Sequence, residues 1–259
     1  MKILVLTSTY ARRPGDTEPR FVDNLCHYVA EADPNAEIHV VAPHAPGIPS
    51  REIMNGIPVY RFRYAPGNWE TLAYAGGILP SLMQNRWRAL LIPFFILSQC
   101  LLALKLTRRH HYDVIHAHWI IPQGLVAVVL RFLVKSPPRL VLTSHGGDLF
   151  ALKGALLTRV KRWIIKHADR LTVVSSAMRD KALQQQLAPA EKINVIPMGV
   201  DSRDSFYPPA DNSERQGLLF VGRLVDKKGI EYLIGAMPAI LQRYPEEILS
   251  IIGDGPLSG

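Results

Sequence analysis

The chain has 259 residues, of which 48% are hydrophobic and 20% charged, and its formal net charge at pH 7 is +8. This globular composition excludes a disordered, collagen-like or fibrous chain. The only two cysteines, Cys26 and Cys100, exclude a disulfide scaffold and a cysteine-rich zinc module, and they suit a reducing cytosol. The length exceeds that at which one core usually stops growing, so we expect one large or two smaller domains.

The amino terminus predicts a buried strand rather than an export signal. The apolar run after Lys2 is short, gives way to Thr7, Ser8 and Thr9, and has no small-residue cleavage site. Further runs rich in Val, Ile and Leu predict strands covered on both faces. With the first strand, their ranges are 2–8, 37–42, 114–117, 139–144, 170–175 and 193–197. The segment 57–63 alternates more and is expected nearer a sheet edge.

Helical patterns lie between these strands, over 20–32, 123–135, 155–168 and 176–186. The first is predicted to bury a face made of Phe21, Leu25, Tyr28 and Val29. The last has Ser175 or Ser176 as its N-cap. Alternating strands and helices predict an α/β fold, a Rossmann-like doubly wound parallel sheet over residues 1–200.

Positive charge is concentrated between residues 86 and 170, which hold 14 Lys and Arg but three acidic residues. Such a surface suits nucleic acid, anionic lipid or a phosphate-bearing substrate. Because no RNA-binding motif, zinc finger or helix-turn-helix accompanies it, we expect no nucleic acid partner.

The segment 89–106 is the strongest membrane candidate of the chain. Pro93, Ser98 and Gln99 interrupt it, whereas a spanning helix needs roughly 20 predominantly apolar residues. A buried or groove-lining helix is therefore favoured. Two interpretations stay open for this segment and for the helix at 155–168: docking on anionic lipid, or a core face opposite a solvated cationic face. On the second helix the expected cationic residues are Arg159, Lys161, Arg162 and Lys166.

The composition changes after residue 200. Residues 201–216 are polar and rich in Pro, which predicts a linker. A strand at 218–222, a helix at 229–244 and a strand at 248–253 follow. Three elements cannot cover both faces of a parallel sheet, so we expect 217–259 to be the first βαβ unit of a truncated second Rossmann-like domain.

Doubly wound sheets bind ligands just past the carboxyl ends of their strands, where three polar clusters of the first domain lie. The loop around Gly15 follows the first strand and lacks G-x-G-x-x-G, which disfavours an NAD enzyme. His118 and Trp119 are expected beyond the end of the strand 114–117, as a polar and an aromatic group suited to a sugar. His116 is expected to point into packing, and His-x-His lacks a third metal ligand, so we expect no metal.

The third cluster is His145, two glycines and Asp148, after an apolar strand. The glycines let backbone N–H groups approach a ligand, and an imidazole donates or accepts a hydrogen bond near neutral pH. An ordinary loop histidine that caps the next helix is the alternative interpretation.

A fourth cluster lies beyond the linker, where Gly222 and Arg223 follow a strand and Lys228 precedes a helix. Two cations at the mouth of a strand–helix unit suit a diphosphate, because Arg binds it bidentately and the helix dipole adds to the attraction. A solvated pair of charges is the alternative.

The motifs VIHAHW, TSHGGD, NVIPMGVD, VGRLVDKKGIEYLI and IIGDGP occur in this order. The chain therefore resembles, over essentially its whole length, the retaining glycosyltransferases of family four, which have the GT-B fold. It is most similar to bacterial transferases that build cell-surface polysaccharide or glycolipid.

The resemblance implies a residue role at each cluster. Donor binding falls to Arg223, Lys228, Gly222 and Gly15, whose loop approaches the donor phosphate or the acceptor, and His145 lies at the reacting sugar. The acceptor-side residues it implies are His118, Trp119 and Asp148. It also implies a nucleotide diphosphate-sugar as donor substrate and no divalent metal.

We therefore expect a retaining glycosyltransferase that moves a sugar to an acceptor hydroxyl. The basic span suggests a phosphorylated or lipid-linked glycan acceptor. We expect the protein in the cytoplasm, peripheral on the inner face of the plasma membrane. The family's paired-glutamate motif would lie beyond Gly259, which suggests an incomplete chain. The alternative is an inactive truncated relative that acts as a membrane-surface or ligand-binding module. A GT-B epimerase or phosphorylase-like enzyme is a third hypothesis.

Overall fold

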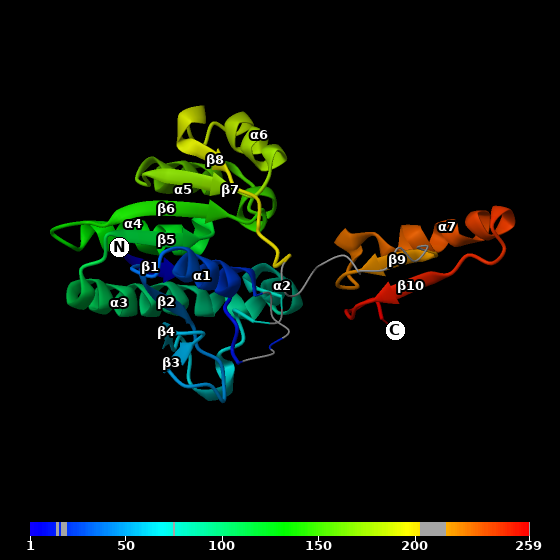
Figure 1. Ribbon diagram of the computed structural model, residues 1–259. Coiled ribbons are helices and arrows are strands. Elements are labelled where there is room, and N and C mark those ends of the chain that lie inside the picture. The colour runs from blue at the N-terminus through cyan, green and yellow to red at the C-terminus, as the bar shows by residue number, and fades with distance from the viewer. Residues whose placement is uncertain (14–15, 17–19, 75, 203–215, 259) are drawn as a thin grey trace. The chain divides into compact units, whose positions relative to one another are not determined.

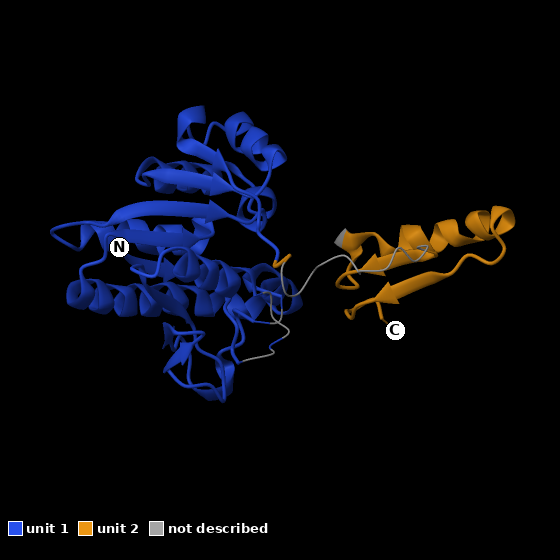
Figure 2. Ribbon diagram, in the orientation of Figure 1, with its two compact units in different colours: residues 1–200 blue, residues 201–259 orange. Residues whose placement is uncertain are grey.

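The computed structural model describes residues 1–13, 16, 20–74, 76–202 and 216–258. The chain divides into two compact units, Met1–Val200 and Asp201–Gly259 (Figure 2). Gly15 and nearly all of the predicted linker, 201–216, lie outside the described residues. Each unit is described by itself below.

Unit 1 contains an eight-stranded sheet in the order β3-β4-β2-β1-β5-β6-β7-β8 (Figure 1). Neighbouring strands are parallel, except for the antiparallel pair β3 and β4. The strands are β1 Lys2–Leu6, β2 Glu37–Pro43, β3 Arg51–Met54, β4 Ile57–Phe62, β5 Val114–His118, β6 Arg139–Ser144, β7 Arg170–Val173 and β8 Ile193–Val195. The predicted doubly wound α/β fold is confirmed. The sequence missed β3, a short edge strand that has two charged residues and in which only Met54 is buried.

Helices cover both faces of this sheet, because successive strand residues point in opposite directions. Leu4 and Leu6 belong to a large apolar cluster with α3, α4, α5 and α6, whereas Ile3 and Val5 belong to a smaller cluster with α1. The helices are α1 Phe21–Ala32, α2 Ile78–Gln84, α3 Ile92–His110, α4 Leu125–Phe132, α5 Ala155–Lys166 and α6 Ser176–Gln184. Ser175 caps α6 as predicted, since its hydroxyl accepts a hydrogen bond from the Met178 N–H at 3.3 Å.

The predicted buried face of α1 is confirmed only in part, since Phe21 and Val29 pack against the smaller apolar cluster. Val22 and Cys26 are buried, whereas Tyr28 is 41% exposed. Two apolar stripes run side by side on this helix, and the more deeply buried one begins one residue later, at Val22. Asp23 is buried on the same side, paired with Arg20 at 2.8 Å. Phe21, which is only partly buried, also contacts the loops at the carboxyl edge of the sheet.

The apolar segment predicted at 89–106 is a short 3₁₀ turn, Arg86–Leu91, followed by α3. The span Arg86–His110 is long and apolar enough to cross a membrane by length and composition alone, and a third of its most apolar window is buried. Phe95, Cys100 and Ala103 pack in the core of unit 1. The opposite side of α3 is exposed. The helix is therefore buried on one side only.

Lys161 of α5 does not lie on a solvated cationic face, contrary to expectation. Its side chain is fully buried, and its ammonium is 3.0 Å from the Leu152 carbonyl oxygen, with those of Asp148 and Leu149 at 3.4 and 3.5 Å. Leu156, at the start of the same helix, is 73% exposed. The cation is tolerated inside because backbone carbonyls at the irregular turn Gly147–Ala151 need a donor.

Unit 2 consists of β9 Leu218–Val221, α7 Ile230–Arg243 and β10 Leu249–Ile252, with β9 and β10 parallel. All three elements were predicted. Leu219, Val221 and Ile252 are more than half exposed, and Tyr232 of α7 is largely exposed. In the described part of this unit, the buried apolar side chains are those of Leu224 and Ile230.

Candidate functional site

The chain reverses its direction across the sheet between β1 and β5. From β1 it proceeds to β2 on one side, and it later crosses to β5 on the other. Ligands of doubly wound sheets bind outside the carboxyl ends of the strands at such a switch point. The segments that follow β1, β5 and β6 meet there, and they hold the first three predicted clusters.

Three imidazoles lie in contact at this edge. His116 and His118 lie on the same face of β5, with ring centroids 4.3 Å apart. His118 Nδ1 is 2.9 Å from His145 Nε2, and the two ring planes are nearly parallel, at 10°, with their centroids 5.2 Å apart. His116 Nε2 is 2.7 Å from the Thr143 hydroxyl. The structure therefore brings His118 and His145 together.

Burial keeps these imidazoles neutral. It lowers the pKa of His116 to about 4 and, with a smaller contribution from His116, that of His145 to about 4. The pKa of His118, which is fully buried, lies well below its usual value for the same reason, and its two histidine neighbours add to the effect. At neutral pH His145 consequently offers a hydrogen bond but no positive charge.

Two aromatic rings enclose His145. Trp119 lies 4.9 Å from it and Phe21, at the start of α1, lies 4.7 Å away. Trp119 has φ +75, an unusual conformation for a bulky residue. Its N–H donates to the Thr143 carbonyl at 2.7 Å, and its carbonyl accepts from the Gly124 N–H at 3.0 Å. The sequence assigned Phe21 to the core and so missed its place at the site.

Asp148 holds two loops of the site together. Its carboxylate is buried and accepts hydrogen bonds from the Ile120 N–H and the Ser144 hydroxyl, both at 2.6 Å. Burial raises the pKa of Asp148, and these hydrogen bonds oppose that rise. The segment after β5 is thereby tied to the segment after β6, so Asp148 positions Trp119 and His145.

His118 is the last residue of β5 and does not lie beyond it, contrary to expectation. Its side chain is 0% exposed and that of Asp148 3%. Both therefore support the site from beneath, and their predicted contact with an acceptor stays a prediction. Trp119 and His145 are partly exposed.

The segment after β1 is polar but packed. Thr7, Thr9 and Tyr10 are buried, and the Thr7 hydroxyl donates to the Thr9 carbonyl at 2.7 Å. The buried Arg61 of β4 fixes this segment, because its guanidinium donates to the Ala11 carbonyl at 2.6 Å. This anchor was not foreseen from the sequence.

In unit 2, Gly222 and Arg223 follow β9, and Lys228 ends the short turn Asp226–Lys228 before α7. A methyl group on Gly222 would lie 4.0 Å from Lys228 Cε, so these two residues are neighbours. Arg223 and Lys228 are both exposed. Two accessible cations therefore lie near the amino terminus of α7, where an anion is favoured.

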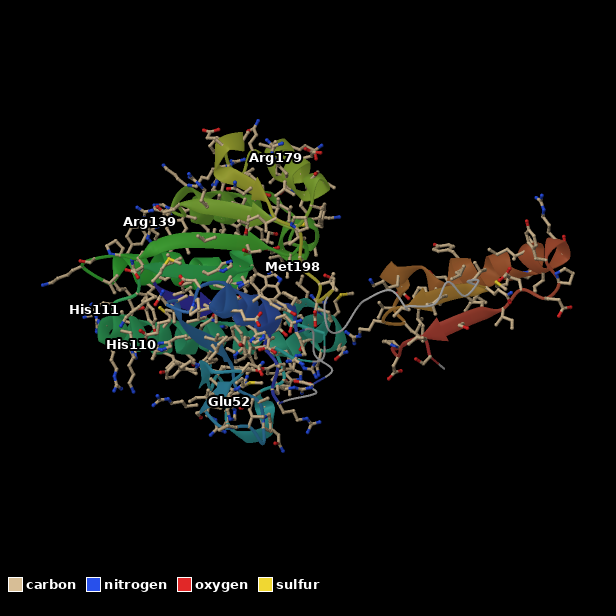
Figure 3. All side chains as sticks on the ribbon, in the orientation of Figure 1. Glu52, His110, His111, Arg139, Arg179 and Met198 are labelled. Carbon is tan, nitrogen blue, oxygen red and sulfur yellow. The ribbon has the colours of Figure 1, made fainter. Side chains whose placement is uncertain are left out.

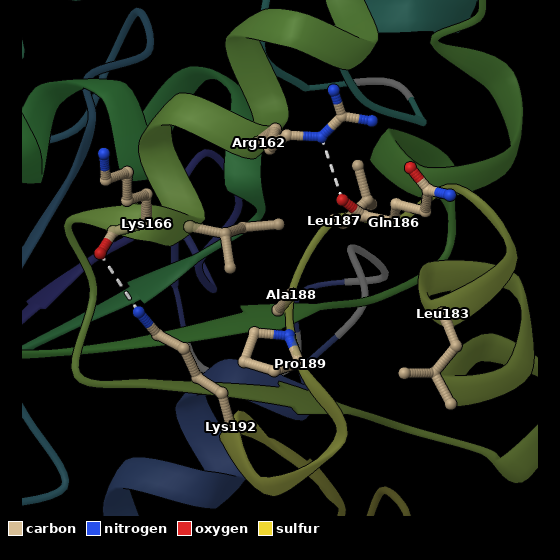
Figure 4. Close-up of a pocket in the computed structure, with 9 residues that line it drawn as sticks. Arg162, Lys166, Leu183, Gln186, Leu187, Ala188, Pro189 and Lys192 are labelled. Atoms are coloured by element: carbon tan, nitrogen blue, oxygen red, sulfur yellow. Dashed lines mark hydrogen bonds between the residues drawn. The ribbon is translucent and has the colours of Figure 1, made fainter.

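A separate pocket of about 480 Å³ lies between the end of α5 and the segment before β8 (Figure 4). Two of its three cations are engaged with backbone, since Arg162 donates to the Gln186 carbonyl at 2.9 Å and Lys192 to the Lys166 carbonyl at 3.1 Å. It lies at the amino end of β8, away from the three histidines. We do not assign it to the candidate site.

Comparison with known proteins places the chain in a family. Residues 19–204 match the model of glycosyltransferase family 4. Glycogen synthase of Mycobacterium tuberculosis is 30% identical over 150 residues, 55% of this chain and 36% of that protein. The putative teichuronic acid biosynthesis glycosyltransferase TuaC of Bacillus subtilis is 29% identical over 225 residues, 80% of this chain and 50% of that protein.

The chain thus spans between about a third and a half of these relatives. Among solved structures, the Anabaena protein HepE in complex with UDP-glucose has a TM-score of 0.58 and 19% identity, over 100% of this chain and 62% of that one. This likeness shows the fold. On the family match, which covers most of unit 1, the chain belongs to glycosyltransferase family 4.

Proposed function

We propose that the complete protein transfers a sugar from a nucleotide diphosphate-sugar to an acceptor hydroxyl, with retention, in the synthesis of a cell-surface polysaccharide or glycolipid. The observation that carries this proposal is the neutral His145, held between Trp119 and Phe21 at the switch point of the sheet. Aromatic rings pack against the apolar face of a sugar. An uncharged imidazole forms a hydrogen bond with a sugar hydroxyl and binds water less strongly than an imidazolium does.

The charge needed for the reaction is supplied by unit 2 in this proposal. The bond from the anomeric carbon to the diphosphate breaks as the acceptor oxygen attacks, and negative charge accumulates on the departing diphosphate. Arg223, Lys228 and the amino terminus of α7 stabilise that charge, without a divalent metal. The UDP-glucose bound to the Anabaena neighbour supports a nucleotide-sugar as the donor class.

A lipid-linked or phosphorylated glycan is the proposed acceptor, with the protein cytoplasmic and peripheral on the inner face of the plasma membrane. The exposed side of the span Arg86–His110 supports this location, with Leu90 72% and Phe94 58% exposed. Leu97 and Leu101 continue the same side, and Arg86, Arg108 and Arg109 are exposed at its two ends. An apolar stripe between cations suits the surface of an anionic bilayer.

The reaction is tested on the complete protein with a panel of UDP-, GDP- and ADP-sugars, by sugar transfer and by thermal shift. We expect one donor to be used, and we expect Arg223→Ala and Lys228→Ala each to weaken donor use by about 2–3 kcal/mol, the scale of a charge-assisted contact. Arg243→Ala, which removes another cation of unit 2 at the far end of α7, is the matched control. A loss under about 0.5 kcal/mol for both variants would assign Arg223 and Lys228 to solvated surface.

Membrane docking is tested by flotation with vesicles of phosphatidylglycerol and phosphatidylcholine at low salt. We expect the protein to float with anionic vesicles, and we expect Phe94→Ser with Leu97→Ser to stay in the soluble fraction. Ile53→Ser changes an exposed apolar side chain on β3 and serves as the control. Flotation without transfer or thermal shift for any donor would favour the alternative, an inactive relative that acts as a membrane-surface or ligand-binding module.

A further inference from the structure

A second cluster of coordinating side chains lies at the amino edge of the sheet, opposite the candidate site. Glu37 opens β2, His39 follows two residues later on the same face, and His110 ends α3. One ligand atom from each lies within 4.8 Å of the others. Figure 3 shows His110 at the same side of unit 1 as Arg139, the first residue of β6.

The spacing of these atoms suits a tetrahedral metal ion. His39 Nε2 is 3.4 Å from Glu37 Oε1. Two ligands of a zinc ion, at bonds of about 2.0–2.1 Å, are separated by about 3.4 Å in tetrahedral geometry. The rings of His39 and His110 are 4.6 Å apart at 87°, so they converge from different directions. His110 is partly exposed at the end of its helix, and one of its ring nitrogens lies within 4.8 Å of the ligand atoms of Glu37 and His39.

His39 is held in the orientation of a metal ligand. It is 4% exposed, and its Nδ1 lies 2.5 Å from the Tyr112 hydroxyl. Metal-binding histidines commonly have their second nitrogen fixed by such a partner, which orients the ring. Nε2 is therefore the nitrogen left for an ion, and it faces Glu37.

The charges around the cluster select the kind of metal. Lys2 lies 3.1 Å from Glu37 Oε2, which leaves Oε1 for an ion but adds a positive charge nearby. A site with two imidazoles, one carboxylate and a nearby ammonium is poor for Mg²⁺ and Ca²⁺, which need several oxygen ligands. Imidazole nitrogen favours Zn²⁺ and its neighbours in the transition series.

We propose that Glu37, His39 and His110 form a binding site for a transition-metal dication such as Zn²⁺, with water as the fourth ligand. The ion joins the carboxyl end of α3 to the amino end of β2, two segments that are 71 residues apart at His39 and His110. Because the site lies at the edge of the sheet opposite His145, it stabilises the scaffold and takes no part in sugar transfer.

The test is a titration of the intact chain, freed of any purification tag, with ZnCl₂ by calorimetry and with CoCl₂ by visible absorption. We expect one Zn²⁺ per chain and the intense visible bands of tetrahedral Co²⁺. His110→Gln and Glu37→Gln should each weaken binding by at least about tenfold, because each removes a ligand. His111→Asn is the matched control, since it removes the adjacent histidine outside the cluster and keeps a residue that tolerates its φ of +50.

Thermal unfolding supplies a second measurement. Zn²⁺ at about 100 times its Kd should raise Tm by about 5–10 °C in the wild type and in His111→Asn, and EDTA should reverse the rise. Mg²⁺ should leave Tm unchanged. The proposal is overturned if the wild type binds no Zn²⁺, if Co²⁺ gives the weak bands of an octahedral ion, or if His110→Gln binds as tightly as the control.

Discussion

Substitution of the buried Asp148 tests whether its carboxylate positions the loops of the site or contacts the substrate. In Asp148→Ala the buried Ile120 N–H loses its acceptor at 2.6 Å. A stranded buried donor costs about 1–3 kcal/mol, and the lost charged hydrogen bond with Ser144 adds about 1–2 kcal/mol. Relief of the carboxylate's desolvation offsets part of this sum, so we expect a net loss near 3 kcal/mol.

Two milder variants calibrate this value. Ser144→Ala removes one of the two hydrogen bonds and should cost about 1 kcal/mol. Asp148→Asn keeps an amide oxygen for the Ile120 N–H and turns its NH₂ to the Ser144 hydroxyl, so it should also cost about 1 kcal/mol. Coupling in the double variant of Ser144→Ala with Asp148→Ala should be about 1 kcal/mol, because the two side chains share one bond.

Urea unfolding followed by tryptophan fluorescence measures these changes in the free energy of unfolding. The signal reports on unit 1, because all four tryptophans lie there. Transfer assays complete the test. If Asp148 positions loops, Asp148→Asn keeps transfer within a few-fold while Asp148→Ala loses most of it. The reasoning is refuted if Asp148→Ala costs less than Ser144→Ala. A stable Asp148→Asn without transfer would instead show contact with substrate.

Three further predictions concern the same edge of the sheet. Because the pKa of His116 and of His145 falls from 6.5 to about 4 on folding, the unfolded chain binds more protons between these values, and stability should fall as the pH drops from 6.5 toward 4. The free energy of unfolding in urea, plotted against pH, should have a slope that corresponds to about one proton fewer in His145→Gln than in the wild type. An unchanged slope would contradict the low pKa of His145. Trp119→Gly should be more stable than Trp119→Ala by about 1 kcal/mol, since alanine keeps the strain of φ +75; equal midpoints would argue against that conformation. Gly124→Ala should cost about 1–3 kcal/mol, because its methyl group would lie 3.0 Å from Ile164 Cγ2, whereas Gly147→Ala, which meets no atom within 4 Å, should be nearly neutral in the same assay.

Most of the fold could be predicted from the sequence because strands of a buried parallel sheet consist of continuous runs of apolar residues. β6, at Arg139–Ser144, was predicted to the residue. β3 escaped because an exposed edge strand has no such run. The sequence did not predict which residues of α1 are most buried. Two adjacent apolar stripes satisfy the same helical period, and tertiary packing decides between them.

The candidate site was predictable only as far as strand ends locate it. Since parallel strands place their carboxyl ends at one edge, His118, Trp119 and His145 could be expected together. The place of Phe21 beside His145 depends on how α1 is rotated, which local sequence does not encode. Glu37 and His110 meet through the long crossover that ends in α3, so no spacing along the chain marks their cluster.

The hydrogen bond between His118 and His145 has one further consequence, for the tautomers of the pair. Both rings are neutral, so one hydrogen is shared between His118 Nδ1 and His145 Nε2. His118 Nε2 is buried without a hydrogen-bond partner among the described residues, and a stranded lone pair costs less than a stranded N–H. His118 therefore carries its hydrogen on Nδ1 and donates it, which leaves the hydrogen of His145 on Nδ1. In the proposed reaction, His145 would then act toward the sugar as a hydrogen-bond donor and not as a base, and ¹⁵N chemical shifts of the two rings report that assignment directly.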